Sequence, residues 1–171
     1  MLKRNLSEEY CPIARSVAVL SDAWSFVILR ELFLGNRTFE GIRRQSSMAP
    51  RALSLRLSHL EKTGVLSRWL ATGKLRRTQY FLTEKGQELW PVVVALKQWG
   101  DKWQGPWDED ESPVSLAHKD HGHPLHLAHI CATCGEPVTV SDAEVNLSAT
   151  YTTLRAQRTA QDREKRRNER R

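Results

Sequence analysis

The sequence predicts a mainly α-helical fold that carries one small β-hairpin. Apolar residues recur at three- and four-residue steps over residues 13–28 and 53–60, the spacing that lines one face of a helix. Between residues 65 and 83 the pattern changes to alternation on both sides of a turn that contains a glycine, as in a hairpin. A wide helical apolar pattern then returns over residues 84–103. Helices therefore dominate, with the hairpin as the β element.

The length and composition exclude several classes of protein. The chain has 171 residues, of which 40% are hydrophobic and 27% charged, a globular balance with room for one domain and an appendage. Its longest apolar stretches, such as residues 92–96, are far shorter than the roughly 20 residues that cross a bilayer. The first nine residues become acidic where a signal peptide becomes apolar, and the three cysteines are an odd number. We expect a cytoplasmic protein that is neither secreted nor inserted in a membrane.

Two helices are expected before residue 35. Ser21-Asp22 lies inside the first apolar run and can cap a second helix, which divides the run into helices over about residues 12–20 and 22–34. Gly35 then supplies a left-handed C-terminal cap.

A short helix and a longer one follow. Thr38 can cap the short helix, which turns Phe39 and Ile42 inward. After a turn, Pro50 suits the start of the longer helix, where its missing N–H does no harm, and Gly64 ends that helix. The buried stripe of the longer helix consists of Leu53, Leu57 and Leu60. The side chains expected on its opposite side are Arg51, Ser54, Leu55, Ser58 and Lys62.

The hairpin and a last long helix complete the predicted domain. The strands are expected at residues 65–70 and 78–83, joined by residues 71–77. The last helix covers residues 84–103, and we expect Pro91 to kink it or to open one hydrogen bond. Its apolar face is wider than one contact usually needs, which favours packing on both its own domain and a second copy. The alternative is that all of these apolar residues pack within one chain.

Charge is distributed unevenly along the chain. The total is +6, but residues 1–100 carry 16 basic and 8 acidic side chains, residues 101–150 carry 2 and 9, and residues 151–171 carry 8 and 3. Clustered Lys and Arg side chains displace counterions from phosphates, so the first block suggests a polyanion as partner. The alternative is that these charges only keep the domain soluble.

A short helix, a turn, a second helix and a basic-tipped hairpin, in this order, make a winged helix-turn-helix arrangement. The second helix fits the major groove of double-stranded DNA, and the hairpin tip can reach flanking phosphates or the minor groove. The predicted DNA-binding residues are Arg37, Arg43, Arg44, Arg51, Ser54, Leu55, Ser58, Lys74, Arg76 and Arg77. A homodimer formed through the N- and C-terminal helices would place two second helices one DNA turn apart, so its site should be an inverted repeat.

Several motifs over about residues 10–105 carry a family resemblance. They are Cys11-Pro12-Ile13, Trp24 with Val27-Ile28-Leu29-Arg30, Gly35-Asn36-Arg37-Thr38-Phe39, Leu53-Ser54-x-Arg56-Leu57-x-x-Leu60-Glu61, Gly64-Val65-Leu66-x-Arg68, Tyr80-x-Leu82-Thr83-x-x-Gly86 and Trp99-Gly100-Asp101. In this succession the chain resembles the HxlR-type transcriptional regulators. The resemblance implies a winged-helix homodimer that binds operator DNA and represses or activates transcription. Ser21-Asp22-Ala23 and Ala49 depart from the family pattern, and both departures concern helix starts rather than DNA contacts.

Cys11 is a candidate redox sensor. The resemblance implies this role, because many family members carry a cysteine at this position and some of them sense electrophiles or oxidants through it. Sensing requires some exposure and a lowered thiol pKa, for which Arg15, one helical turn on, supplies a nearby cation. The alternative is a small, buried and inert core residue.

His118 with His121, and Cys131 with Cys134, form two pairs of metal-ligand residues. Two residues separate the members of each pair, and nine residues separate the pairs. Such pairs can close a tetrahedral structural zinc site, and Gly135 relieves the tight turn after the second pair. The resemblance points the same way, since a subset of the family carries a similar extension, usually with Cys in place of His121. Alternatives are a redox-active dithiol, a metal site that has lost its metal, or substitute ligands among His123, His126 and His129.

These observations divide the chain into three parts. Residues 1–107 are expected to form the winged helix-turn-helix domain for DNA binding and dimerisation. Residues 108–149 hold an acidic linker and a zinc-ribbon-like His/Cys extension. Residues 150–171 are polar and cation-rich without an apolar stripe, which predicts a disordered tail in the absence of DNA.

The sequence therefore predicts a sequence-specific transcriptional regulator that responds to an unidentified small molecule or oxidant. An enzyme is not expected, because the chain has no His-Glu-x-x-His helix, no phosphate-cradling glycine loop and no nucleophile elbow. The alternative functions are a protein-interaction module on the same scaffold and a metal-dependent enzyme that uses the His/Cys segment.

Overall fold

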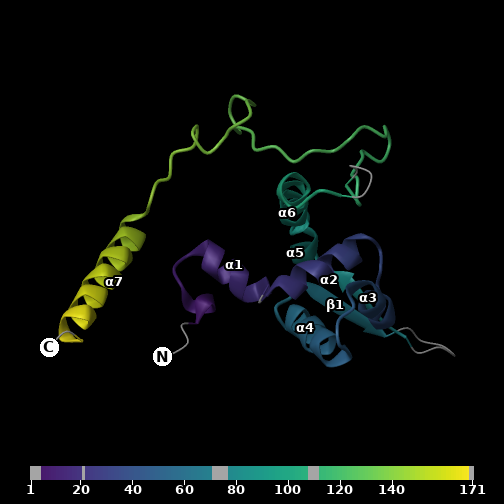
Figure 1. Cartoon of the computed structure of the whole chain (residues 1–171), viewed down its shortest axis with the longest axis horizontal. Helices are drawn as coiled ribbons and strands as arrows, with labels where there is room; N and C mark the ends of the chain where they lie inside the picture. The colour runs from purple at the N-terminus through teal and green to yellow at the C-terminus, as the bar shows by residue number, and fades with distance from the viewer. Residues whose placement is uncertain (1–4, 21, 71–76, 108–111, 170–171) are drawn as a thin grey trace. The chain divides into compact units, whose positions relative to one another are not determined.

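The computed structural model describes residues 5–20, 22–70, 77–107 and 112–169. They fall into two compact units, Met1–Leu127 and Ala128–Arg171, and each unit is described by itself. The first unit contains a 3-10 helix (Leu6–Glu8), α1 (Pro12–Leu20), α2 (Ala23–Phe33), α3 (Phe39–Ser46), α4 (Pro50–Lys62), β1 (Leu66–Leu70), β2 (Thr78–Leu82), α5 (Glu84–Gln87) and α6 (Trp90–Trp103) (Figure 1). The second unit contains α7 (Ala149–Asn168). This order confirms the predicted mainly α-helical winged fold.

Helix α2 lies at the centre of the first unit, with α4 and α6 on opposite sides of it (Figure 1). Its Ile28 and Leu29 are fully buried in the core. Full burial of a side chain of this size contributes about 1.5–3 kcal/mol, against ~1 kcal/mol for a helix cap, so the core holds the unit together. The other fully buried core side chains are Ile42, Leu53, Leu57, Leu60 and Val65. The predicted buried stripe of α4 is thereby confirmed.

Helix starts follow the predicted caps. Asp22 Oδ1 accepts a hydrogen bond from Ser25 N at 3.3 Å, and Thr38 Oγ1 accepts one from Gly41 N at 3.1 Å. These bonds satisfy N–H groups that have no partner inside a first helical turn. Helix α4 has the predicted proline in its first turn and no side-chain cap.

Two polar contacts fix α4 against the junction of α1 and α2. Arg56 forms an ion pair with Asp22, the residue that also caps α2. His59 Nε2 donates to the carbonyl oxygen of Val19 at 2.9 Å. Because both contacts use side chains one turn apart on the same helix, they define how far α4 is rotated about its axis.

The hairpin is tied to the end of α4 and to the start of α3. Strands β1 and β2 pair antiparallel, from Leu66 opposite Leu82 to Leu70 opposite Thr78. Thr83 Oγ1 donates to the carbonyl oxygen of Gly64 at 2.7 Å, and Gly64 has a φ of 74°, which favours glycine. The strands are therefore anchored at their base.

The predicted helix over residues 84–103 is divided in two. Helix α5 ends at Gln87, and α6 starts at Trp90 with Pro91 in its first turn. A proline inside a continuous helix would lose one hydrogen bond and clash with the carbonyl four residues before it, which is that of Gln87. At the start of a new helix neither cost arises, so the chain breaks here instead of kinking.

The tail predicted to be disordered contains helix α7. Ser148 caps this helix by accepting a hydrogen bond from Tyr151 N at 3.2 Å. Asp162 pairs with Arg166 at 2.9 Å, four residues on. The segment is rich in Ala, Arg, Gln, Glu and Lys, which favour helix. Caps and side-chain pairs support helix without an apolar stripe, and none of the residues of α7 is buried.

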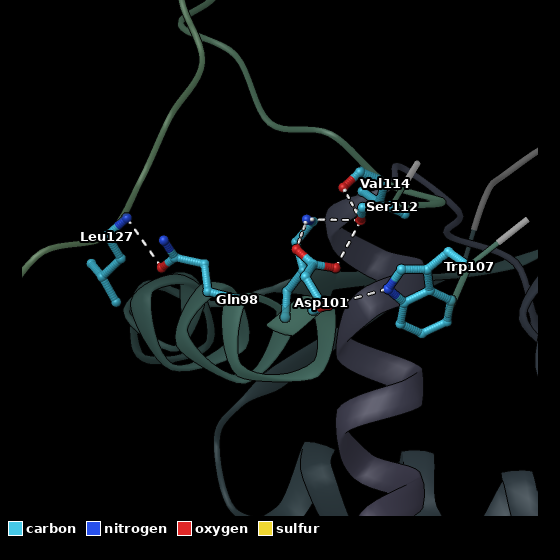
Figure 2. A network of polar contacts seen from close by, with 7 residues as sticks. Gln98, Asp101, Trp107, Ser112, Val114 and Leu127 are labelled. Carbon is cyan, nitrogen blue, oxygen red and sulfur yellow. Dashed lines mark hydrogen bonds and ion pairs between the residues drawn. The ribbon is translucent and has the colours of Figure 1, made fainter. Parts of the chain in front are cut away.

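The first unit continues to Leu127, beyond the boundary predicted at residue 107. The reason is a set of hydrogen bonds from the following chain to α6 (Figure 2). Trp107 Nε1 donates to the Asp101 carbonyl oxygen at 3.4 Å, and Ser112 Oγ donates to the Asp101 carboxylate at 2.7 Å. Leu127 N donates to Gln98 Oε1 at 3.1 Å. These bonds hold the chain after α6 against that helix.

Among the described residues, no single helix is long and apolar enough to cross a membrane. Helices α1 and α2 meet the requirements of length and composition only as a pair, which is bent by 72°.

Asp22 offers a test of the anchor between α2 and α4. We expect Asp22→Ala, which loses both the cap and the ion pair, to lower the free energy of unfolding by about 1–2 kcal/mol. Asp22→Asn keeps a capping oxygen and loses only the charge, so its loss should stay below about 1 kcal/mol. Urea unfolding followed by circular dichroism measures both. Equal losses in the two variants would contradict the capping role.

Candidate nucleic-acid interface

A tight turn joins α3 to α4. Helix α3 ends at Ser47, whose φ of 55° lies in the left-handed region. The next residue, Met48, is buried, and its N–H donates to Ser46 Oγ at 3.4 Å. Met48 therefore anchors the turn of residues 47–49 to the core, and the turn sets the positions of the two helices that form a helix-turn-helix.

The side of α4 opposite its buried leucines is open to solvent. Arg51, Ser54 and Leu55 are exposed, and Leu55 retains 61% of its accessible surface. Ser58, further along the same side, is half-buried. The placement agrees with the predicted outward face, although contact with DNA remains a prediction. A guanidinium and small hydroxyl groups on one helix face are suited to hydrogen bonds with base edges.

Cations border this face on α3 and near the hairpin. Arg43 Nε lies 2.9 Å from Glu40 Oε2, and Arg44 is exposed. An exposed ion pair of this kind contributes little, so Arg43 can exchange Glu40 for a phosphate at small cost. The Arg37 guanidinium lies over the Phe81 ring, 4.8 Å from its centroid.

The hairpin contributes further exposed side chains. Arg77, just before β2, is exposed, whereas the predicted contacts Lys74 and Arg76 lie outside the described residues. Two side chains that the sequence analysis did not select also face solvent on β1, Arg68 and Trp69. Arg68 Nε lies 3.4 Å from Glu61 Oε1 on α4. These two neighbouring side chains point to opposite faces of the hairpin, and both are exposed because only Leu66 of β1 is buried, so alternation in the sequence could not have selected them.

Cys11 lies directly before α1 and is half-buried. The expected cation, Arg15, donates from Nε to the carbonyl oxygen of Glu9 at 2.6 Å. Its guanidinium is therefore already used to hold the chain before α1. Redox sensing by Cys11 stays a prediction.

The histidine pair and the cysteine pair each lie on a turn, and the two turns have the same backbone pattern. In the first unit, His118 N donates to His123 O and Gly122 N donates to His118 O, both at 2.8 Å. In the second unit the corresponding bonds run from Cys131 N to Glu136 O and from Gly135 N to Cys131 O, both at 2.9 Å. Both glycines have positive φ, 67° and 73°.

The surroundings of Cys131 favour its thiolate. Backbone N–H groups of Cys134 and Thr133, followed by the Cys134 side chain, lower the pKa of the Cys131 thiol from its ordinary value. The rings of His118 and His121 stack with centroids 4.6 Å apart. Within the part of the chain that the structure describes, no group of three or more His, Cys, Asp or Glu side chains is gathered to hold a metal ion. The zinc site therefore stays a prediction.

Two helices joined by a tight turn, an exposed cationic face on the second helix and an anchored hairpin define a winged helix-turn-helix protein, a class that binds DNA. The family model of HxlR-like helix-turn-helix proteins matches residues 19–108. The chain belongs to this family, as its motifs predicted.

Curated relatives and solved structures agree with this family assignment. An uncharacterised HTH-type transcriptional regulator of Mycobacterium tuberculosis is 33% identical over 131 residues, 74% of this chain and 79% of the relative. Another, from Synechocystis, is 36% identical over 94 residues, 54% of this chain and 70% of the relative. The crystal structure of PA1607, assigned as a transcription factor, gives a TM-score of 0.75 at 32% identity, over 85% of this chain and all of that one. The reduced form of the redox regulator HypR gives a TM-score of 0.51 at 27% identity, over 55% of this chain and 94% of that one.

The family and these relatives are transcriptional regulators and not enzymes. The protein is accordingly a DNA-binding regulator. The matches to the Mycobacterium tuberculosis protein and to PA1607 cover more of the chain than the family model does, so the similarity continues past the helix-turn-helix domain.

Proposed function

We propose that the protein regulates transcription by binding, as a homodimer, to an inverted-repeat operator that it recognises by sequence. The observation that carries the proposal is that the polar side chains of α4 fall into two groups, one bonded within the fold and one exposed. Arg56 and His59 are engaged with the α1–α2 junction, whereas Arg51 and Ser54 face solvent. A helix fixed in rotation, with an open polar face, can present the same side chains to the same base pairs each time it enters the major groove.

Each exposed side chain has a role set by its chemistry. Arg51 is suited to a bidentate contact with guanine, and Leu55 packs on a thymine methyl group. Ser54 and Ser58 bond to several bases. The remaining predicted contacts hold phosphates and carry no sequence information. These are Arg37, Arg43, Arg44, Arg77 and, by the sequence prediction, Lys74 and Arg76.

Exposed apolar side chains on α1 and α6 support the homodimer. Trp99 and Trp103 keep 55% and 62% of their surface exposed, and Ile13 on α1 keeps 74%. Single exposed apolar residues are ordinary, but so many large ones on two helices indicate a surface that another protein covers. The set comprises Ile13, Val17, Trp90, Val92, Leu96, Trp99 and Trp103. A second copy of the chain is the occupant that suits a two-fold operator.

An oxidant response through Cys11 belongs to the same proposal. HypR, to which the chain is similar in fold, is a redox regulator. Cys11 is half-buried and not enclosed in the core, which is compatible with a reaction with a small oxidant. A regulator of transcription works where the DNA is, which agrees with the predicted cytoplasmic location.

We also propose that His118, His121, Cys131 and Cys134 bind one structural zinc ion. The likeness of the two turns supports this, because each places its pair of ligands on a tight turn closed by a glycine with positive φ. Two histidines and two cysteines complete a tetrahedral zinc site and leave no open position for catalysis.

Removing single side chains should separate base contacts from phosphate contacts. With an operator selected from a random DNA pool, Arg51→Ala should lose about 1–3 kcal/mol of binding to the preferred sequence and relax the preference at one position. Arg77→Ala should weaken binding to all sequences alike and reduce the salt slope by about one. Gel-shift titrations at several salt concentrations measure both effects.

Lys119→Ala, which removes an exposed cation far along the chain from α4, is the control and should change neither quantity. Equal losses on operator and random DNA for Arg51→Ala and Arg77→Ala would contradict the assigned roles. If the unmodified protein shows no preference over competitor DNA at physiological salt, the interaction module becomes the better explanation.

The homodimer is tested with two equally exposed residues. The unmodified chain should sediment at twice its 19.6 kDa mass. Trp99→Glu buries a charge in the proposed interface and should yield monomers, whereas Leu70→Glu on the hairpin, also 55% exposed, should leave the dimer intact. A dimer that survives Trp99→Glu would place the interface elsewhere.

The zinc proposal predicts one zinc ion per chain by elemental mass spectrometry of the purified protein. Cys134→Ser should lose most of it, because serine is a poor zinc ligand, while Thr133→Ala in the same turn should retain it. Removal of His118 or His121 without loss of zinc would assign the metal to other histidines. A metal-free protein would refute the site.

A further inference from the structure

A cavity of about 430 Å³ lies in the first unit between α2 and α6. Residues 112–116, which we name the strap, form its third wall. The size falls in the range of pockets that bind small organic molecules. The cavity side chains that carry the argument are Phe26, Phe33, Trp90, Trp107, Val114 and Leu116. It is separate from the DNA-contacting face of α4.

Hydrogen bonds to α6 tie the strap down, so the third wall is part of the fold. Ser112 Oγ donates to Asp101 Oδ1 at 2.7 Å and accepts from Lys97 Nζ at 3.2 Å (Figure 2). Partial burial by itself would raise the pKa of the Asp101 carboxyl, but hydrogen bonds from Lys97 and Ser112 hold that pKa below its ordinary value. The carboxylate therefore stays ionised at neutral pH, and the strap stays tied.

The lining defines the chemistry of an occupant. Aromatic rings from α2 and α6 meet in the wall, where the Phe33 and Trp90 centroids lie 5.0 Å apart. The cations of the lining are already paired, Arg30 with Glu31 at 2.7 Å and Lys97 with Asp101. An anionic ligand would have to break one of these pairs, whereas a neutral ring system would stack on the aromatic side chains and bury apolar surface.

We propose that this cavity binds a small, neutral, aromatic molecule of two or three rings. Binding itself does not depend on the proposed function. The consequence for regulation does, because α6 carries much of the proposed dimer surface and packs on α2, to which α4 is anchored through Asp22 and Arg56. A molecule that separates α6 from α2 would alter the spacing of the two recognition helices in a dimer.

The test titrates the full-length protein with 1-naphthol, a neutral two-ring probe, by isothermal titration calorimetry. Gly100 lines the cavity, and a Cβ added to it meets nothing within 4 Å beyond its own helix. Gly100→Leu therefore adds a large apolar side chain to the cavity lining without a clash at its Cβ, while Gly100→Ala adds only a methyl group. Wild type and Gly100→Ala should each bind one 1-naphthol per chain, and Gly100→Leu should bind it about tenfold more weakly or worse. Ser112→Ala, which releases the strap, should also weaken binding.

1-Naphthoate, the same ring system with a carboxylate, is the charge control and should bind more weakly than 1-naphthol. No binding to wild type, undiminished binding to Gly100→Leu, or tighter binding of 1-naphthoate would overturn the proposal. Circular dichroism and sedimentation check the fold and assembly of Gly100→Leu. If the fold or the assembly of Gly100→Leu changes, the proposal is judged by whether Ser112→Ala binds 1-naphthol more weakly than wild type. Gel shifts on the same samples report DNA binding, so a failed ligand site and a failed regulatory function give different results.

Discussion

The burial of α2 on both sides is the constraint on which the rest of the structure depends. Ile28 and Leu29 are inaccessible to solvent, and a helix that is apolar on more than one face needs a partner on each. Helix α4 covers one side and α6 the other. Each covering helix packs one face on α2 and leaves its opposite face exposed to solvent. The open face of α4 is polar and cationic, and that of α6 is rich in tryptophan, so one packing solution produces two surfaces of different chemistry.

Packing determines which polar side chains of α4 bond within the fold and which remain exposed to solvent. Arg56 and His59 point toward the α1–α2 junction and are used in the fold, at Asp22 and at the Val19 carbonyl. Arg51 lies on the opposite side of α4 and is exposed to solvent. Substituting Arg56 would therefore disturb DNA binding indirectly, by freeing the rotation of α4. A loss of binding alone does not identify a DNA contact, and only changed sequence preference or salt dependence does so.

Periodicity predicted the parts of the fold whose stability comes from an apolar stripe. Helices α2 to α4 and the outward placement of Arg51 follow from it, because burial selects every third or fourth residue in a helix. Apolar spacing also predicted α1 and the hairpin, although only Leu20 of α1 and only Leu66 of β1 are buried. Periodicity missed the break between α5 and α6, because the apolar spacing continues across residues 88 and 89, where the helix is interrupted. It also missed α7, which has no stripe, and the role of Arg56, since its partner Asp22 is distant in sequence. The strap depends on Ser112 and Asp101, eleven residues apart and without a repeating pattern.

The cavity occupies the place where the covering of α2 is incomplete. Val94 of α6 is buried, and beside it α2, α6 and the strap together line the cavity. Close-packed interiors resist small displacements, whereas a gap lined by apolar side chains can be filled or collapsed at lower cost. A ligand shifts such an equilibrium only by the difference in its affinity for the filled and collapsed arrangements. Since α2 is held to α6 on one side and to α4 on the other, a change at this gap reaches both the proposed dimer surface and the recognition helix through a single shared element. Regulation by a small molecule then requires no contact between that molecule and the DNA-binding face.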